Sequence, residues 1–405
     1  MNRKVVYVTS QCPFGIGEIY AIRELISLME EGVDLFIIPR TGSGKIVNKN
    51  ANKLISKTIS TPFINFPIVF SVIRKLITEP LNFIAILRWL IGQSNSFTDF
   101  VKGMVVLPKS IFIGNQLKEK GIEHIHAFSS TSVAVVAYIL ANELKIPWSV
   151  TFHSSWTIDE NHRRSVYSHV KSVSFVRAIS NEVSNVLKEF IEPQLSVRII
   201  VLHLGVKCDD LNGDNLIRRN DFIIVSSGGP WSFKGIDISL LAARKILDKG
   251  IKNFKWTIYG DGPLMKNILK MSEDLHLNEN VHIAGQIDNK DLLNQYKNGE
   301  VDLGVLNSIK RDGIQEGIPF SLMEAMVYAI PVIATDCGGT KELVDGESGV
   351  LLKQGDPEST AIAIIGFMSN KEKRIQQGLK GREKILKEFD SKIIAKQLLN
   401  LFFKI

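Results

Sequence analysis

Two carboxylates lie on either side of a Gly-x-Pro break in the segment 316–326. Glu316 and Glu324 are separated by seven residues, and Pro319 lies between them. Apolar runs typical of β-strands precede and follow the segment, at 301–306 and 331–335. Because proline suits the first turn of a helix, where its missing N–H costs nothing, we expect Glu316 in a loop and Glu324 in a helix that begins near Pro319.

Free backbone N–H groups at such a helix start make an anion-binding site. A carboxylate before this site and another behind it could accept hydrogen bonds from two sugar rings that flank a diphosphate. The alternative interpretation is an ordinary strand, loop and helix with two solvated glutamates. The segment alone leaves both interpretations open.

The same segment resembles the Glu-x7-Glu signature of family-4 retaining glycosyltransferases, which have the GT-B fold. Other stretches resemble further motifs of that family, in the same order along the chain, at 258–263, 281–285, 331–339 and 342–344. The resemblance covers most of the chain and is densest between residues 222 and 353. Several ordered motifs are far more specific than any one of them.

The resemblance implies roles for the polar residues. Glu324 would hold the ribose of a nucleotide, and Glu316 would hold hydroxyl groups of the donor sugar. Lys234 would neutralise the leaving diphosphate. His153 would lie near the anomeric carbon, although a lone histidine at a strand end is more often structural. The helix start would cap the donor phosphates through the residues Pro319, Phe320, Ser321 and Leu322.

Two glycine-containing loops complete the donor site that the resemblance implies. The loop 13–18 resembles one in polysaccharide-assembling members of the family, where Gly15 and Gly17 let backbone N–H groups approach the donor; a simple tight turn is the alternative. In the loop 227–235, Gly228 and Gly229 occupy the positions where the family has an arginine before Lys234. Their N–H groups could form an anion-binding nest that substitutes in part for the missing cation.

The implied activity is transfer of a sugar, with retention of its anomeric configuration, from a nucleotide-sugar to a hydroxyl group of a glycan or a lipid-linked saccharide. No cofactor and no metal are expected, because no Asp-x-Asp pair accompanies the donor motifs. Two alternatives stay open. One is a nucleotide-sugar 2-epimerase of the GT-B fold, and the other is a non-catalytic nucleotide-sugar-binding protein, which the missing arginine makes conceivable.

Strands and helices alternate along the 405 residues, which predicts an α/β architecture with parallel sheets covered on both faces. The alternation begins near residue 5 and starts again near residue 222. Two such halves predict two facing Rossmann-like domains. We place an N-terminal acceptor-side domain at 1–210 and a nucleotide-sugar-binding domain at 211–388. The resemblance implies a C-terminal helix, 389–405, that crosses back to the N-terminal domain.

The composition limits the classes of partner. The formal net charge is +7, and no basic patch with interleaved aromatic residues indicates a nucleic-acid partner. Three widely spaced cysteines indicate neither a disulfide framework nor a zinc site, which fits a reducing cytoplasm. No uninterrupted apolar run reaches the roughly 18 residues that a membrane span needs.

The segment 63–91 is rich in aromatic and aliphatic residues. Its cations are Arg74, Lys75 and Arg88, against the single acid Glu79. Such a composition is typical of pieces that lie in the interface of an anionic membrane. Helices packed on the N-terminal sheet are an equal alternative. The first interpretation predicts a cytoplasmic protein that is peripheral to the inner face of a membrane.

Overall fold

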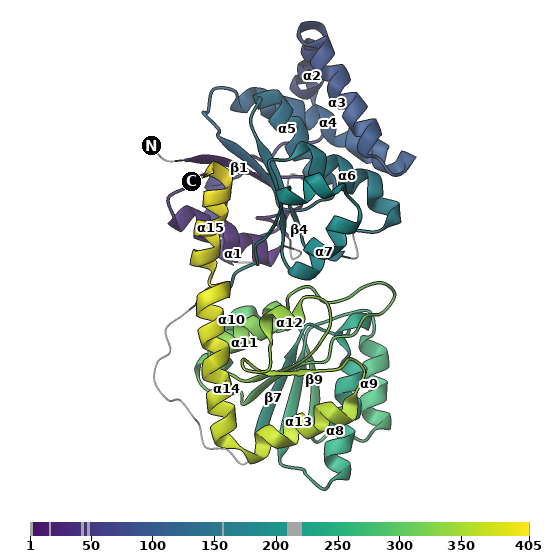
Figure 1. Ribbon diagram of the computed structural model, residues 1–405, viewed down its shortest axis with the longest axis vertical. Coiled ribbons are helices and arrows are strands. Elements are labelled where there is room, and N and C mark those ends of the chain that lie inside the picture. Colours follow the sequence, from purple (N-terminus) through teal and green to yellow (C-terminus); the bar gives the residue numbers. More distant parts are fainter. Residues whose placement is uncertain are drawn as a thin grey trace. The chain divides into compact units, whose positions relative to one another are not determined.

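In the computed structural model, the structure describes residues 3–15, 18–41, 44–46, 49–155, 158–208 and 221–404. The chain divides into two compact units (Figure 1). The N-terminal unit comprises 1–205 and 391–405, and the C-terminal unit comprises 206–390. These boundaries lie within five residues of those placed from the sequence.

The N-terminal unit is built on a six-stranded sheet in which all neighbouring strands are parallel. Its strands, in the sheet order β2-β1-β3-β4-β5-β6, are β2 (Asp34–Pro39), β1 (Lys4–Thr9), β3 (His124–Ala127), β4 (Trp148–Phe152), β5 (Phe175–Ala178) and β6 (Ile199–Val201). Thr58 adds a single parallel bridge to Ile37 of β2, where a further edge strand would lie.

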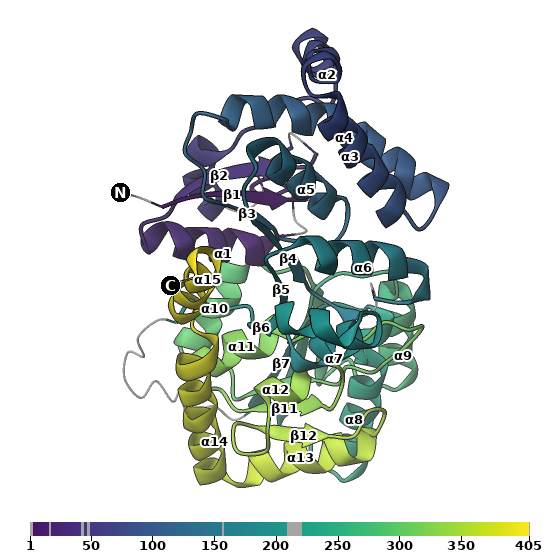
Figure 2. The ribbon, with the colours of Figure 1, turned by 45° about the horizontal axis from the view of Figure 1, so that its top comes forward.

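Helices surround this sheet, as Figures 1 and 2 show. They are α1 (Ile19–Glu30), α2 (Phe66–Thr78), α3 (Pro80–Gln93), α4 (Phe97–Leu117), α5 (Ser132–Leu144), α6 (Arg163–Ser172) and α7 (Asn181–Glu189), with the short turns η1 (Lys49–Lys57), η3 (Glu160–His162) and η4 (Pro193–Arg198). Pro67 and Pro80 divide the segment 63–91 into separate helices, because they lie in the first turns of α2 and α3.

The C-terminal unit has a second parallel six-stranded sheet. Its strands, in the sheet order β12-β11-β10-β7-β8-β9, are β12 (Val350–Leu352), β11 (Val332–Thr335), β10 (Leu303–Leu306), β7 (Phe222–Ser227), β8 (Phe254–Tyr259) and β9 (Val281–Gly285). This is the strand order of a doubly wound mononucleotide-binding sheet. The associated helices are η5 (Ser232–Lys234), α8 (Ile236–Asp248), α9 (Met265–Asp274), α10 (Asn289–Lys297), α11 (Phe320–Val327), α12 (Thr340–Leu343), α13 (Pro357–Ser369), α14 (Lys371–Lys384) and the π-helical turn η6 (Ile385–Phe389).

The last helix, α15 (Ser391–Phe403), belongs to the N-terminal unit and packs against α1. The predicted return of the C-terminal helix is therefore confirmed. So is the predicted fold class, since each unit is a parallel Rossmann-like sheet flanked by helices. None of the helices in the described part of the chain is long and apolar enough to cross a membrane.

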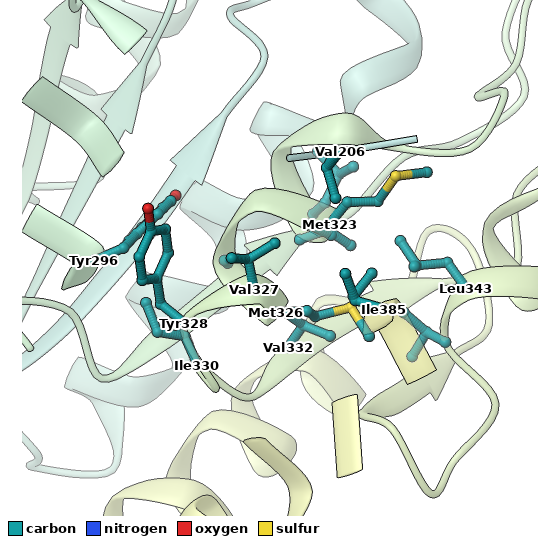
Figure 3. Packing of buried hydrophobic residues seen from close by; sticks show 14 of the residues in the cluster. Val206, Tyr296, Met323, Met326, Val327, Tyr328, Ile330, Val332, Leu343 and Ile385 are labelled. Carbon is teal, nitrogen blue, oxygen red and sulfur yellow. The ribbon is translucent and has the colours of Figure 1, made fainter. Parts of the chain in front are cut away.

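Helix α11 is fixed by the apolar core of the C-terminal unit. Met323 and Met326 are fully buried. Their side chains lie among residues that include Val206, the first residue of the unit, and Ile385, close to its last residue (Figure 3). Burying an apolar side chain of this size stabilises by about 1.5–3 kcal/mol. The core therefore holds the helix on which Glu324 is carried.

Candidate functional site

The strand order of the C-terminal unit creates a switch point between β7 and β10. From β7 the chain continues to β8 on one side, and it later returns to place β10 on the other side. At such a point the loops that follow the two strands diverge and leave a crevice at the carboxyl ends of the strands, where ligands bind in doubly wound folds. The loop after β7 carries Lys234, and the loop after β10 carries Glu316.

Lys234 and Glu316 form an ion pair at this switch point. Lys234 Nζ lies 2.7 Å from Glu316 Oε2, and the two side chains are 14% and 10% exposed. The hydroxyl of Ser308 donates to the same carboxylate oxygen at 2.9 Å. The two residues that the resemblance assigns to the diphosphate and to the donor sugar are therefore hydrogen-bonded to each other.

Glu316 lies in the loop and Glu324 in α11, as predicted from Pro319, which is the N-cap residue of this helix. Both glutamates are buried. Glu324 accepts a hydrogen bond from Asn289 Nδ2 at 3.0 Å, so the start of α10 orients its carboxylate.

Some backbone N–H groups at the start of α11 already donate hydrogen bonds within the protein. The N–H of Leu322 already donates to Pro319 O at 3.2 Å, whereas the N–H of Ser321 has no backbone acceptor among the described residues. Of the expected phosphate-capping positions, Ser321 is thus the better placed donor, and Pro319 contributes the helix start rather than an N–H.

Close backbone packing fixes the loop that carries Glu316. Gly338 has φ +59°, and a Cβ there would lie 1.8 Å from Glu316 O. Gly339 N–H donates to Gly317 O at 3.1 Å. Gly338 and Gly339, which follow β11, therefore pack directly against the backbone of this loop. A larger residue at Gly338 would displace the loop and with it the carboxylate of Glu316.

A second glycine joins the loops on the two sides of the crevice. Gly235 has φ +60°, and a Cβ there would lie 1.8 Å from Asn307 O. Ile309 N–H donates to Phe233 O at 2.8 Å, which ties η5 to the loop after β10. This packing places Lys234 beside the carboxylate it pairs with.

Gly228 and Gly229 do not form the anion nest expected from the sequence. Both of their N–H groups donate to Tyr259 O, at 3.1 and 3.0 Å, so these donors are already used. Gly229 has φ +70°, and a Cβ would lie 2.3 Å from Asp261 O. The pair instead allows this loop to lie directly on the loop after β8, and the assignment of the two glycines to donor binding stays a prediction.

The loop after β1 in the N-terminal unit is held by a buried carboxylate. Glu18 accepts three backbone N–H bonds, from Ser10 at 3.0 Å, Gln11 at 2.7 Å and Cys12 at 2.9 Å. Gly15 has φ +71°, and its N–H donates to Lys45 O at 3.1 Å. Gly17, the other glycine assigned to the donor, lies outside the described residues.

His153 follows β4 at the carboxyl edge of the same sheet. Its ring lies against Phe128 and Tyr20, with ring centroids 4.6 and 5.5 Å apart, and its Nε2 is hydrogen-bonded to Phe128 O. Because a carbonyl oxygen only accepts, Nε2 carries the proton and Nδ1 is the acceptor. Burial lowers the pKa of His153 to about 4, against the opposing effect of the bond to Phe128. The imidazole is therefore neutral near pH 7.

A polar pocket of about 230 Å³ lies elsewhere in the N-terminal unit. Its lining comes from the end of α3, the first turns of α4 and α5, and from α6, and includes Asn95, Asp99, Lys102, Ser130 and His162. A pocket rich in hydroxyl, amide and charged groups can satisfy the many donors and acceptors of a saccharide. No sequence motif indicates this pocket, because its residues come from four separate segments.

Glu18, Asn289 and Ser308 were also missed as positioning residues. Glu18 does stand directly before a helix, where the helix dipole favours a carboxylate, and this signal was available. The contacts of Asn289 and Ser308 arise only from tertiary packing. Among the described residues, no group of three or more His, Cys, Asp or Glu side chains could hold a metal ion.

One known family model matches residues of the C-terminal unit. Residues 209–384 match the family model described as "Glycosyl transferases group 1". A putative colanic acid biosynthesis glycosyltransferase, WcaL of Salmonella typhimurium, is 30% identical over 171 residues, which are 42% of this chain and 41% of WcaL. The alignment thus spans about two fifths of that relative. N-acetyl-alpha-D-glucosaminyl L-malate synthase of Bacillus anthracis is 22% identical over 71% of this chain and 76% of its own length.

Solved structures resemble the chain over its whole length. A glycosyltransferase from Rickettsia africae has a TM-score of 0.75 at 18% identity and covers 100% of this chain and 98% of its own. HepE of Anabaena, solved with UDP, has a TM-score of 0.71 at 16% identity and covers 100% of both chains. At such identities these likenesses show the fold alone, which is the GT-B architecture.

Proposed function

We propose that the protein is a retaining glycosyltransferase, a proposal that the match of residues 209–384 to the model of glycosyl transferases group 1 supports. It moves a sugar from a nucleotide-sugar donor to a hydroxyl group of a glycan or lipid-linked saccharide. The observation that carries the proposal is the Lys234–Glu316 pair at the switch point between β7 and β10, with Glu324 on the helix that follows.

In this proposal, the side chain of Lys234 acts electrostatically. In the transfer, the bond between the anomeric carbon and the diphosphate oxygen breaks, and a bond to the acceptor oxygen forms on the same face. Negative charge develops on the leaving diphosphate, which takes the proton of the acceptor hydroxyl. Lys234 lies where it could stabilise that charge, and a cation already fixed in place needs no reorganisation during the reaction.

The two glutamates bind rather than exchange protons in this proposal. Glu316 accepts hydrogen bonds from hydroxyls of the donor sugar, and Glu324 from the ribose. His153, neutral at pH 7 because burial lowers its pKa to about 4, contributes its Nδ1 as a hydrogen-bond acceptor. No metal or other cofactor takes part, and this remains part of the proposal.

The acceptor saccharide is assigned to the N-terminal unit. The polar pocket near the start of α4 supports this assignment, because it offers hydroxyl, amide and carboxylate groups over about 230 Å³. Two relatives support a saccharide acceptor: WcaL is a putative colanic acid biosynthesis glycosyltransferase, and AmsK of Erwinia amylovora is an amylovoran biosynthesis glycosyltransferase. The proposed acceptor is accordingly a growing glycan or its lipid-linked precursor.

A screen of nucleotide-sugars by thermal shift tests the donor. UDP-sugars are the first choice, because HepE and the TarM of Staphylococcus aureus were solved with UDP. Ligand at about 100 times its dissociation constant stabilises the folded protein by about 2.7 kcal/mol. A protein that no nucleotide-sugar stabilises would contradict the proposal.

Incubation of the donor so identified with saccharide acceptors then separates the remaining functions. Transfer with an unchanged anomeric configuration, read by NMR of the product, supports the retaining enzyme. Interconversion of the sugar without an acceptor indicates the 2-epimerase. Donor binding with neither reaction indicates a non-catalytic binding protein, which the absent arginine beside Lys234 would favour.

A further inference from the structure

Helix α2 presents an apolar stripe to solvent rather than to the core. Its residues recur at helical spacing on one face, and each is between 41% and 83% exposed: Phe66, Val69, Phe70, Ile73, Leu76 and Ile77. The opposite side of the helix holds its two buried residues, Ile68 and Lys75. A surface helix of a globular protein normally has the reverse arrangement.

An ion pair fixes the helix in this orientation. Lys75 Nζ lies 2.5 Å from Glu143 Oε1 and 3.1 Å from Glu79 Oε2, and the side chains of Lys75 and Glu143 are 3% and 1% exposed. Turning α2 to bury its apolar stripe would leave Glu143 as an uncompensated buried charge, which costs several kcal/mol. The outward stripe is therefore a stable feature of the fold.

The exposed apolar surface continues onto the neighbouring helices. Leu81 on α3 is 81% exposed, and Phe97 on α4 is 80% exposed; Ile84, Ile91, Val101 and Val105 are exposed as well. Helix α2 packs on α3 and α4, and Figures 1 and 2 both show the three helices together, with α2 projecting away from the sheet of its unit. A monomer seldom leaves so many large apolar side chains uncovered on adjoining elements.

Basic residues outnumber acidic ones in the segment that contains the three helices. Residues 60–120 contain seven lysines and arginines and three acidic residues. The exposed cations are Arg74, Arg88, Lys102 and Lys118. The ammonium of Lys75 is instead buried in the ion pair with Glu143. A projecting apolar face with basic residues around it fits an anionic bilayer, in which apolar side chains enter the acyl boundary and cations meet the headgroups.

We propose that the exposed face of α2, with the adjoining parts of α3 and α4, docks the protein on an anionic membrane. With 13 residues, α2 is shorter than the roughly 20 residues that a spanning helix needs, so it lies along the interface. This inference does not depend on the catalytic assignment.

One corollary does rest on the proposed function. Phe97 and Val101 belong to the docking face, and Asp99 and Lys102, on the same turns of α4, line the polar pocket. A lipid-linked acceptor anchored in the bilayer would therefore reach this pocket with its saccharide. The lipid-linked form is favoured over a free glycan as the substrate class.

Flotation of the full chain with vesicles tests the docking. We expect binding to vesicles of phosphatidylcholine with about one third phosphatidylglycerol at low salt, weaker binding at 0.5 M salt, and little binding to phosphatidylcholine alone. The triple variant Phe66→Gln, Phe70→Gln and Ile77→Gln should bind at least tenfold more weakly, since each phenylalanine or isoleucine loses its transfer into an apolar phase. Removing Arg74 should lower low-salt binding by about fivefold.

A matched control keeps this result interpretable. The triple variant Leu269→Gln, Ile362→Gln and Leu379→Gln removes three exposed apolar side chains from the C-terminal unit and should bind vesicles as the native chain does. An environment-sensitive dye on Phe70→Cys should shift to the blue on anionic vesicles, and one on Leu269→Cys should not.

Two results would overturn the proposal. One is equal flotation of the two triple variants. The other is a native chain that does not bind anionic vesicles but forms a dimer, detected by light scattering, when the triple variant of α2 stays monomeric. The exposed face of α2 would then bind a second copy of the chain. Donor binding is measured separately by thermal shift, so failure of docking and failure of the glycosyltransferase assignment are distinguishable.

Discussion

The Lys234–Glu316 pair predicts that its two members affect nucleotide binding with opposite sign. Lys234 Nζ lies 2.7 Å from Glu316 Oε2. A diphosphate that binds Lys234 must share or displace this carboxylate. Glu316→Gln releases the cation and should tighten binding of the nucleoside diphosphate alone. Lys234→Ala removes the cation and should weaken it.

The magnitudes follow from the burial of the pair. A hydrogen bond to a charged group contributes about 1.5–3 kcal/mol. Lys234→Ala should therefore weaken nucleoside diphosphate binding by roughly tenfold to a hundredfold, and Glu316→Gln should tighten it by up to about tenfold. Turnover of the complete nucleotide-sugar should fall at least tenfold in both variants, because Glu316→Gln also loses its bonds to the sugar.

Stability must be followed in the same variants. Removing one partner of a buried pair costs about 3–5 kcal/mol, and we expect the lower end here because both side chains retain some exposure. The double variant should be more stable than the sum of the single changes predicts, since neither charge is left alone. Lys380→Ala, which removes an exposed ion pair of the same unit, serves as the control and should alter neither stability nor binding.

Affinity is measured by isothermal titration with the nucleoside diphosphate, stability by denaturant unfolding, and turnover by steady-state kinetics. If Lys234→Ala leaves both donor affinity and turnover within about threefold of the native protein, another cation holds the diphosphate. Arg311, whose guanidinium donates to Ser232 O at 3.2 Å beside the same loop, would be the first candidate. The site at the switch point would then be wrongly assigned.

Three further outcomes are expected. Glu324→Ala should raise the KM for the donor at least tenfold with a smaller change in kcat, read by steady-state kinetics, because the ribose does not react; equal losses in both would contradict its role. Gly229→Ala should be far more destabilising in denaturant unfolding than Gly250→Ala, since both have positive φ but only the first places a Cβ against backbone, at 2.3 Å; similar losses would refute the clash. Stability should fall as the pH drops from about 6.5, because burial lowers the pKa of His169 to about 3 and only the unfolded chain takes up the proton, at up to about 1.4 kcal/mol per pH unit for this one group. Burial lowers the pKa of His124 to about 3 and that of His153 to about 4 as well, so His169→Phe should reduce the dependence in thermal melts between pH 7.5 and 5 by the share of one histidine.

Regular elements were predictable where local pattern and packing agree. The bounds expected for the helices 132–144 and 236–248 are those observed. Strand β5 was missed because Arg177 interrupts its apolar run. That arginine is fully buried, where its Nη1 lies 2.6 Å from Glu24 Oε2 and its Nε donates to Leu202 O at 2.8 Å. No local rule distinguishes an arginine neutralised by a residue 153 positions away from one that faces solvent.

The two glutamates of the donor motif could be placed from the sequence because Pro319 marks a helix start. Their partners could not, since Lys234 and Glu316 come together only through the strand order of the sheet. The segment 63–91 shows the same limit. Its apolar period predicts helices correctly, but only the buried Lys75 reveals that the apolar face points outward.

The close packing of two loops in the C-terminal unit explains why position 229 carries no arginine. A Cβ at Gly229 would meet Asp261 O, one at Gly260 would meet Gly229 N at 2.4 Å, and one at Gly262 would meet Pro230 O at 2.7 Å. The loops after β7 and β8 thus lie backbone on backbone, which leaves no room for a side chain at 229. Charge compensation for a diphosphate in this loop then depends on Lys234, whose partner in the structure is the carboxylate of Glu316. In the proposed site, donor binding exchanges this carboxylate for the diphosphate at one lysine, so the affinity is set by the difference between the two pairings rather than by the strength of either.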